Sequence, residues 1–358
     1  MLVILAFFAA CLFAFNIGAS GSAASMGVVY GSKVIKHKKV ALFLAGSGAI
    51  VGALWGGKHV THTLGKGIIP EEIMDVRIAT IILAVSACTL FVTNYIGIPL
   101  STSEVTVGAI VGIGLSFQQI YAVSILEIVG LWLLIPILAF FVTYTLEKVR
   151  MKYRDKIKVS FSSKILAGLL IITGIFEAIA AGMNNVANAL GPLVGANLVT
   201  MEIGLPVLAL VVALGSILFG GKVLDTNAKK ITNLSLANGI VVSSTTGILV
   251  IAASFLGVPI PMTQVTTTAI VGISATKSWQ NVWKEKIIHR IAKVWISSPI
   301  ISLVISYSLT EIIIRHSYYT VILLFLTILI TIVLMKYQVK SETKQQEHQL
   351  RREWEEIG

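Results

Sequence analysis

Long apolar runs, separated by short polar linkers, follow one another along almost the whole chain. Most of them are long enough, or nearly long enough, to cross the hydrocarbon core of a bilayer as helices. The runs lie at 1–31, 40–56, 78–97, 99–117, 120–146, 164–199, 205–220, 234–257, 259–275, 288–309 and 317–335. The pattern therefore predicts an all-α integral membrane protein with about eleven spans, several of them interrupted by Gly, Pro or Asn.

Basic residues concentrate in four of the linkers. They are Lys33, Lys36, Lys38 and Lys39; Lys148, Arg150, Lys152, Arg154, Lys156, Lys158 and Lys164; Lys222, Lys229 and Lys230; and Lys277, Lys284, Lys286, Arg290 and Lys293. If every run crosses once, all four linkers fall on one side, and the positive-inside rule assigns that side to the cytoplasm. This predicts an outer amino terminus and an inner carboxyl terminus. Re-entrant hairpins stay open as an alternative, although reading either broken run as a hairpin would move the central basic linker outside.

The second half of the chain repeats the first in the same order. The matched segments are Asn16–Gly21 with Asn184–Ala189, Gly97–Leu100 with Gly257–Ile260, and Trp132 and Pro136 with Trp295 and Pro299. Each half holds about five spans, an odd number, so the halves are expected to be inverted repeats, as in many transporters. The predicted units are repeat 1 with the basic central linker at 1–163, the inverted repeat 2 at 164–316, an extra final span at 317–335 and a cytoplasmic tail at 336–358.

The first pair of interruptions is rich in amides and small residues. It comprises 15–22 and 182–188. Backbone groups freed at a helix break inside the membrane need a partner from protein, ligand or water. Close helix packing would also use such residues. Because the breaks occur in both repeats, we predict a substrate site near the membrane midplane that includes Asn16, Ser20, Asn184, Asn185 and Asn188.

The second pair of interruptions places a hydroxyl residue two positions after a proline. The segments are 99–104 and 259–264, and their candidate ligands are Ser101, Thr102, Ser103 and Thr263. Proline followed by Ser or Thr is typical of a helix start. A helix start within the membrane directs free N–H groups and a positive dipole end at the site, which suits an anion. Proline-capped helices at the interface are the alternative. We predict that both pairs of interruptions converge in one cavity.

Carboxyl groups inside predicted spans are candidates for proton coupling. Glu104 lies in the hydroxyl segment, and Glu177 lies two helical turns before Asn184 on the same helix face. Ionisable groups inside membranes are costly and are functional candidates by default. A carboxyl group in a low-dielectric site beside a dianion favours its protonated form. Glu104 is the first candidate carrier and Glu177 the second; a permanently ionised helix cap is the alternative role for Glu104.

The composition limits other functions. Of 358 residues, 56% are hydrophobic and 13% charged, and the net charge of +11 resides in linkers, so nucleic acid is not an expected partner. Two cysteines, Cys11 and Cys88, lie apart in apolar runs, which predicts no disulfide framework, metal site or cofactor. The sequence offers no nucleophile–base pair, so an enzyme is not expected.

These motifs are similar to those of a known family. Across nearly its whole length the chain resembles the inorganic phosphate transporter (PiT) family, which carries a GANDxANA-like motif and a Pro-x-Ser-Thr-Thr-His-like motif in each half. Segments 16–20, 99–105 and 183–191 are most like its bacterial sulfate permease branch. The resemblance implies an inverted-repeat fold and secondary, ion-coupled uptake. The motif aspartates of the family are Ile17 and Asn185 here, and its histidine is Glu104 and Gln264.

These substitutions favour sulfate over phosphate. Phosphate keeps a proton at neutral pH and needs an acceptor, whereas sulfate is fully deprotonated and needs donors only. The predicted function is therefore sulfate uptake across the cell membrane, driven by protons in preference to sodium. The alternative is a phosphate or other oxyanion permease, coupled to sodium or protons. Besides the anion, the coupling proton and the lipid bilayer, a second copy of the chain in a homodimer is a possible partner.

Overall fold

The computed structural model describes residues 1–96, 100–153, 162–231, 234–277, 279, 286–323, 325, 326, 329 and 330. Of residues 95, 96, 227, 229–231 and 286–296, only the backbone is described. The predicted tail at 336–358 lies outside these residues, and the predicted final span at 317–335 lies within them only in part. The predicted all-α membrane fold is confirmed. Seven described helices are long and apolar enough to cross a bilayer.

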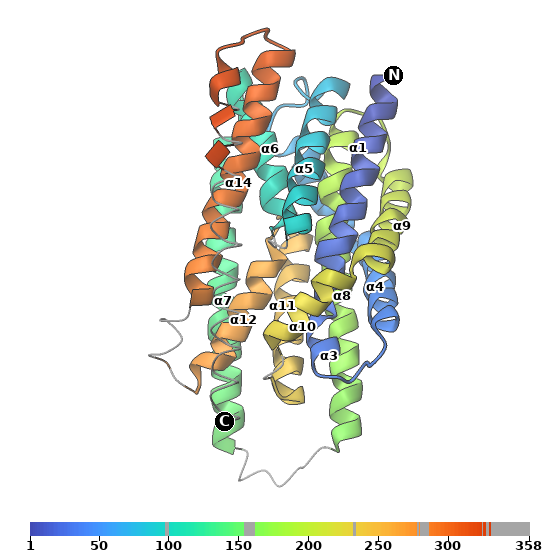
Figure 1. Ribbon diagram of the computed structural model, residues 1–358, viewed down its shortest axis with the longest axis vertical. Helices are drawn as coiled ribbons and strands as arrows, with labels where there is room; N and C mark the ends of the chain where they lie inside the picture. Colours follow the sequence, from blue (N-terminus) through green and yellow to red (C-terminus); the bar gives the residue numbers. More distant parts are fainter. Residues whose placement is uncertain are drawn as a thin grey trace, which may run out of the picture.

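The described helices follow the apolar runs closely. They are α1 (Leu2–Ile17), the π-helical turn η1 (Gly18–Ser22), α2 (Ala23–Ser25), α3 (Gly27–Gly31), α4 (Lys38–Lys66), α5 (Val76–Ile96), α6 (Thr102–Phe117), α7 (Ala122–Tyr153), α8 (Ser163–Gly195), α9 (Met201–Phe219), α10 (Gly221–Ile231), α11 (Leu236–Phe255), α12 (Met262–Ala275) and α14 (Lys286–Ile313). They form one elongated bundle (Figure 1).

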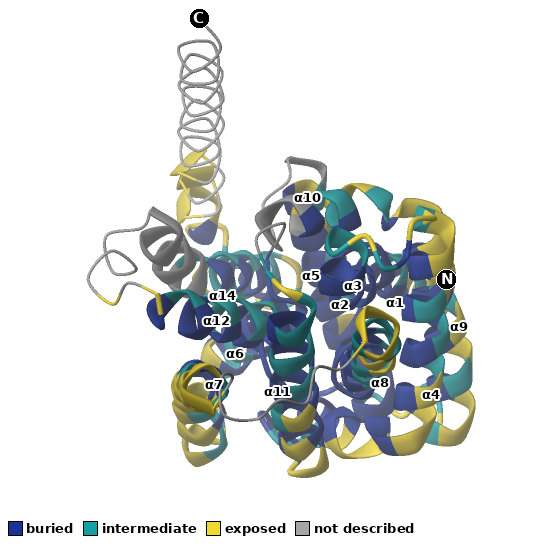
Figure 2. Cartoon of the chain, turned by 90° about the horizontal axis from the view of Figure 1, so that it is seen from below, coloured by how far each residue is buried: buried dark blue, intermediate teal, exposed yellow. Residues whose placement is uncertain are grey.

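Helix α8 runs through the interior of the bundle. Every residue of its segment Ala180–Gly195 is buried, whereas α7 and α9 expose rows of large apolar side chains at the periphery (Figure 2). A helix buried on all faces belongs to the core of a membrane bundle, and exposed apolar rows suit contact with lipid. α8 is therefore the element around which the other helices are arranged.

Two connected helices, α5 and α6, form a hairpin that returns to the end from which it enters. The backbone N–H of Tyr121, after α6, donates to the carbonyl of Ile68, before α5, at 2.9 Å. In Figure 1 the start of α6 lies about halfway along the molecule. This first hairpin therefore has its open side at the upper end in that view and its tip near the middle.

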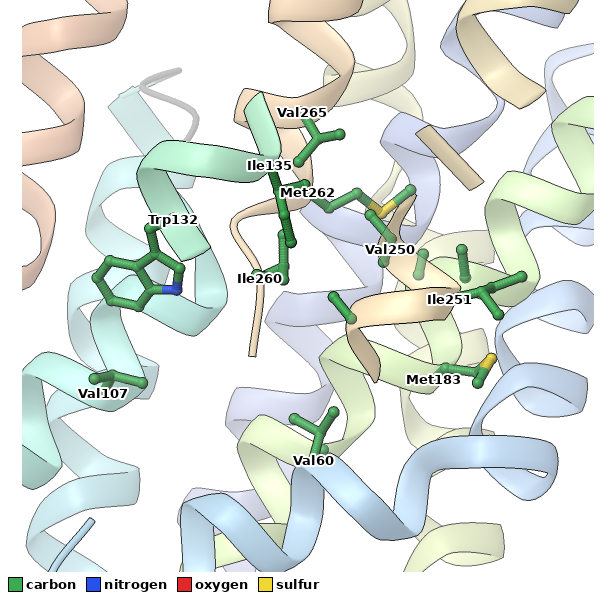
Figure 3. Packing of buried hydrophobic residues seen from close by; sticks show 14 of the residues in the cluster. Val60, Val107, Trp132, Ile135, Met183, Val250, Ile251, Ile260, Met262 and Val265 are labelled. Carbon is green, nitrogen blue, oxygen red and sulfur yellow. The ribbon is translucent and has the colours of Figure 1, made fainter. Parts of the chain in front are cut away.

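A second hairpin, α11 and α12, enters from the opposite end. The long helix α7 begins just after Tyr121 and has 32 residues, about 48 Å at 1.5 Å per residue. Near its far end, Arg150 Nη2 donates to Asn238 Oδ1 in the first turn of α11 at 2.9 Å. About a third of the way along α7, Trp132 Nε1 donates to the carbonyl of Pro259 at the hairpin tip at 2.6 Å. Apolar residues such as Ile135, Ile260 and Met262 surround this tip (Figure 3).

The hairpins correct the prediction that each of these four runs crosses the membrane once. Ser103, at the first tip, lies 3.2 Å from the carbonyl oxygen of Ile260, at the second. Tips that enter from opposite ends and touch must both stop inside the bundle. Run length alone does not distinguish a hairpin arm from a span. The side of the basic linkers is unaffected, and the first and third are joined by Lys38 and Asp225 at 2.5 Å. Entry from opposite ends is what inverted repeats require; the repeat relation itself stays a prediction.

The predicted helix breaks at the amide-rich segments differ from the observed backbone. In the first half the helix widens into the π-helical turn η1 and stays helical. In the second half the predicted break is wrong, because α8 continues without interruption from Ser163 to Gly195. The small residues there serve close packing on α4: a Cβ atom built at Gly182 would lie 2.1 Å from the carbonyl oxygen of Ala49.

We predict that Gly182→Ala lowers the thermal stability of the protein. The added methyl group would meet backbone atoms of α4, which cannot rotate away, and overpacking of this kind costs about 1–3 kcal/mol. Gly168→Ala on the same helix is the control, since a Cβ atom there meets nothing within 4 Å and alanine is the better helix former. The measurement is the midpoint of thermal denaturation in detergent. Equal midpoints for the two variants would contradict the packing argument.

Candidate functional site

The two hairpin tips and α8 meet at Asn184. Its side-chain oxygen, Oδ1, accepts from the backbone N–H of Ile260 at 3.1 Å and lies 3.1 Å from Ser103 Oγ. Its amide nitrogen donates to Ser254 Oγ at 3.1 Å and to the carbonyl of Val258 at 3.2 Å. One side chain therefore joins α8 to both hairpins. It also gives hydrogen-bond partners to backbone groups of the non-helical segment between α11 and α12.

Two further asparagines on α8 extend this polar cluster toward the first hairpin. Thr102 Oγ1 donates to Asn185 Oδ1 at 3.1 Å, and Asn188 Nδ2 lies 3.4 Å from both Thr102 Oγ1 and Ser103 Oγ. Asn188 Oδ1 has no hydrogen-bond partner among the described residues. Ser103, Asn184 and Asn188 have 0% exposed surface, so the cluster is occluded from both ends in this conformation.

The amide-rich segment of the first half approaches the cluster through its backbone. A Cβ atom at Gly21 would lie 2.8 Å from Asn185 Nδ2, so the π-helical turn contacts α8 there. Asn16 Nδ2 donates to the carbonyl of Leu12 at 2.9 Å, and Ser20 Oγ donates to that of Asn16 at 2.9 Å. Both side chains are buried. These bonds lie within their own helical segment and do not join them to Asn184.

The two predicted helix starts differ in their capping. Ser101 is the N-cap of α6, and its Oγ accepts from the backbone N–H of Glu104 at 3.4 Å. The N-cap of α12 is Pro261, which has no side-chain hydrogen bond. Thr263 is half-buried, and its carbonyl accepts from Thr267 Oγ1 at 2.6 Å. The structure thus groups Thr102, Ser103, Asn184, Asn185 and Asn188, with Ser101 capping the helix beside them. It gives Thr263 no comparable place.

Glu104 and Gln264, which occupy equivalent positions in the two halves, bind each other. Gln264 Nε2 donates to Glu104 Oε1 across the hairpin tips, and the hydroxyl of Ser298 on α14 lies beside the same carboxyl group. Glu104 is 1% exposed, and its Oε2 has no partner within the described part of the chain. The two hairpin tips are therefore joined by this carboxyl–amide contact as well as through Asn184.

Glu177, about two helical turns before Asn184 on α8, forms a second buried carboxyl site. Thr266 Oγ1 donates to Glu177 Oε1 at 3.1 Å, and the hydroxyl of Ser243 on α11 lies beside the carboxyl group. Glu177 is 1% exposed, and its Oε2 also lacks a partner in the described residues. The two carboxyl sites share this design: one oxygen is held by the second hairpin and the other is free.

Sequence reasoning missed several residues that hold the site in place. Ser254 and Trp132 fix the second hairpin tip through the hydrogen bonds to Asn184 and Pro259. The repetition of Trp132 as Trp295 was the available signal for the contact with Pro259, although the side chain of Trp295 lies outside the described residues. Ser298 carried no sequence signal, since serines are frequent in membrane helices of every role.

Comparison with known proteins places the chain among anion permeases. The profile of the phosphate transporter family matches residues 17–163 and 148–306. The sulfate permease CysP of Bacillus subtilis is 46% identical over 312 residues, which are 87% of this chain and 88% of that protein. A probable low-affinity inorganic phosphate transporter of the same organism is 28% identical over 294 residues, 77% of this chain and 86% of that protein.

A solved structure gives the same fold. A sodium-dependent phosphate transporter superposes with a TM-score of 0.75 at 22% sequence identity, covering 87% of this chain and 100% of that chain. At this level of identity the likeness concerns the helix arrangement alone. Together with the seven apolar helices, these relatives show a multi-pass protein of the cell membrane.

We predict that Asn184→Ala weakens the junction of the hairpins more than any single neighbour does. The variant leaves the N–H of Ile260 without this acceptor and the carbonyl of Val258 without this donor, and each unsatisfied buried group costs about 1–3 kcal/mol. Ser254→Ala is the matched control, because Asn184 Nδ2 then keeps its bond to Val258. Thermal denaturation and anion uptake should both fall further in Asn184→Ala. The same loss in both variants would show that Asn184 is not the central junction.

Proposed function

The chain belongs to the phosphate transporter family, and we propose that it carries inorganic sulfate into the cell by secondary active transport. At the coarser level, the family match and the permease relatives support a membrane transporter of inorganic anions, not an enzyme. The choice of sulfate, the coupling ion and the site are our proposals. The cluster formed by Thr102, Ser103, Asn184, Asn185 and Asn188 is the proposed sulfate site, with Asn16, Ser20, Ser101 and Thr263 as outer members.

The observation that carries the proposal is the chemistry of this cluster. Its side chains are amides and hydroxyls, all of which can turn an N–H or O–H toward a ligand. Neither position of the family's motif aspartates is acidic, since Ile17 and Asn185 stand there. A fully deprotonated tetrahedral dianion needs donors and is repelled by carboxylates. The start of α6 adds a helix N-terminus, whose dipole stabilises negative charge.

Similarity supports sulfate, and phosphate remains the second candidate. The relative with 46% identity is named a sulfate permease. The family name, the 28% identical relative and the superposed structure speak for phosphate. A phosphate ion that keeps a proton could donate it to Glu104, whose Oε2 is free. The cluster contains no carboxylate and can turn several donors toward a ligand, which favours sulfate between the two.

Charge arithmetic favours two coupling protons. A dianion entering a negative cell interior is opposed by about 2.3 kcal/mol per charge per 100 mV, so two co-transported cations are needed to remove that opposition. Two buried carboxyl groups, Glu104 and Glu177, each have one oxygen without a partner among the described residues. We propose that each takes one proton, with Glu104 as the first carrier. Proton binding and sulfate binding then favour each other, as symport requires.

Asn185→Asp should weaken sulfate binding. The substitution keeps the acceptor for Thr102 and places a negative charge beside the proposed dianion site. Asn197→Asp, the same change at an exposed loop residue, should leave binding unchanged. The measurement is calorimetric titration of the purified protein with sulfate and, separately, phosphate near neutral pH. Tighter binding of phosphate than sulfate by the wild type would overturn the substrate, and a gain in sulfate affinity in Asn185→Asp would overturn the charge argument.

Glu104→Gln should abolish the acceleration of sulfate uptake by an inward proton gradient. The amide is nearly isosteric but cannot carry a proton across. Uptake into proteoliposomes is measured with and without a pH gradient, with sodium replaced by choline in a parallel series. Glu202→Gln, at an exposed carboxylate, is the control and should keep the response. A Glu104→Gln protein that still accumulates sulfate with unchanged pH dependence would exclude Glu104 as carrier, and a strict sodium requirement would exclude proton coupling.

A further inference from the structure

At the open side of the first hairpin, a buried carboxylate ties α6 to α14. Ser116 Oγ, in the last turn of α6, donates to Glu311 Oε1 at 2.7 Å. Glu311 is only 4% exposed, and Arg315 lies 3.8 Å from the same oxygen and packs over the ring of Phe117 at 5.3 Å. The charge of Glu311 is thus partly compensated by Arg315 and partly by the hydroxyl of the hairpin.

At the open side of the second hairpin, a similar group ties α11 to α7. Arg150 donates twice to Glu147, at 2.7 Å each, and once to Asn238 Oδ1 at 2.9 Å. Glu147 is 3% exposed. Ser235 Oγ donates to the same Asn238 oxygen at 2.8 Å. Here the arginine, held by the buried carboxylate, makes the bond to the hairpin.

The two groups occupy corresponding places in the two halves. Glu147 and Glu311 follow the matched prolines Pro136 and Pro299 by 11 and 12 residues. Each stands near the end of a long helix, and each such helix packs against the hairpin of the other half: α14 against α6, and α7 against α12. The two groups lie at opposite ends of the bundle. Glu311 adjoins the last turn of α6, just before Tyr121, and Glu147 lies near the far end of α7, which begins just after Tyr121.

We propose that Ser116–Glu311–Arg315 and Glu147–Arg150–Asn238 are opposing latches, which set the side to which the polar cluster opens. The hairpin tips cover Asn184 and Asn188, and with both latches formed the cluster has no exposed surface at Ser103, Asn184 or Asn188. Movement of a hairpin away from its long helix would uncover the cluster from that hairpin's own end. Glu147 and Glu311 act through Arg150 and Ser116, so they are positioning residues.

The proposal rests on the proposed transport function but on neither the identity of the anion nor the coupling ion. The expected size of the effect follows from the shift in population between the occluded conformation and the conformation open to one side. Loss of one hydrogen bond to a charged partner should raise the population open to that side about tenfold, equivalent to about 1.4 kcal/mol. The two ends should respond independently, because the latches share no residue.

The test is sided labelling of a reporter cysteine. In a background with Cys11 and Cys88 replaced by serine, Ser101→Cys at the first hairpin tip is labelled by a membrane-impermeant thiol reagent in right-side-out and inside-out vesicles. Ser116→Ala should raise labelling about tenfold from the end that carries Tyr121. Asn238→Ala should raise it about tenfold from the end that carries Arg150. Thr226→Ala, which removes only a bond within α10, is the control and should change neither rate.

Conservative variants keep the test decisive if a latch variant folds poorly. Ser116→Thr retains the hydroxyl and Asn238→Asp retains the acceptor, so both should label as slowly as the parent. Acceleration from the same side by both alanine variants, or acceleration by neither in monodisperse protein, would overturn the latches. Labelling needs no transported anion, so its result does not depend on whether sulfate is the substrate. The binding titrations test the substrate separately.

Discussion

The structure depends on the satisfaction of backbone polar groups at the point where two helical hairpins stop inside the membrane. Such groups cannot be left to lipid, because each unsatisfied N–H or C=O costs several kcal/mol in hydrocarbon. Asn184 removes this cost on one side by accepting from the N–H of Ile260 and binding the carbonyl of Val258. Trp132 does the same for the carbonyl of Pro259. The continuous α8, buried throughout its segment Ala180–Gly195, suits this role, since it holds the amides rigidly at one level.

The same constraint makes the junction suitable for an anion. Groups gathered to satisfy broken backbone are neutral donors and acceptors, and several of them can exchange partners. Ser103 Oγ has one proton and two acceptors in reach, Asn184 Oδ1 and the carbonyl of Ile260. Asn188 Oδ1 and the free oxygens of Glu104 and Glu177 have no partner in the described residues. We propose that a site built this way binds a dianion without a buried lysine or arginine, whose strong attraction for the dianion would oppose its release.

The sequence predicts the helical membrane fold and the grouping of polar residues better than it predicts the path of the chain. Ser101 as the cap of α6 follows from the serine and threonine that come shortly after Pro99. The hairpins could not be read from the sequence, because arms such as Val76–Ile96 are as long and apolar as spans. The unbroken α8 was missed for a related reason: Gly182 and the asparagines serve both helix breaks and tight helix packing. The pairing of Glu104 with Gln264 needs the hairpins to meet, which only the three-dimensional arrangement reveals.

The central claim is that the hairpin tips and α8 hold a tetrahedral dianion. Selenate has the charge and shape of sulfate and scatters X-rays anomalously, so crystals of the protein grown with selenate test the claim directly. The account predicts an anomalous peak within about 4 Å of Ser103 Oγ and Asn188 Nδ2, a distance set by a hydrogen bond plus the Se–O bond. A peak found only among the basic linkers, with none beside Asn188, would contradict it.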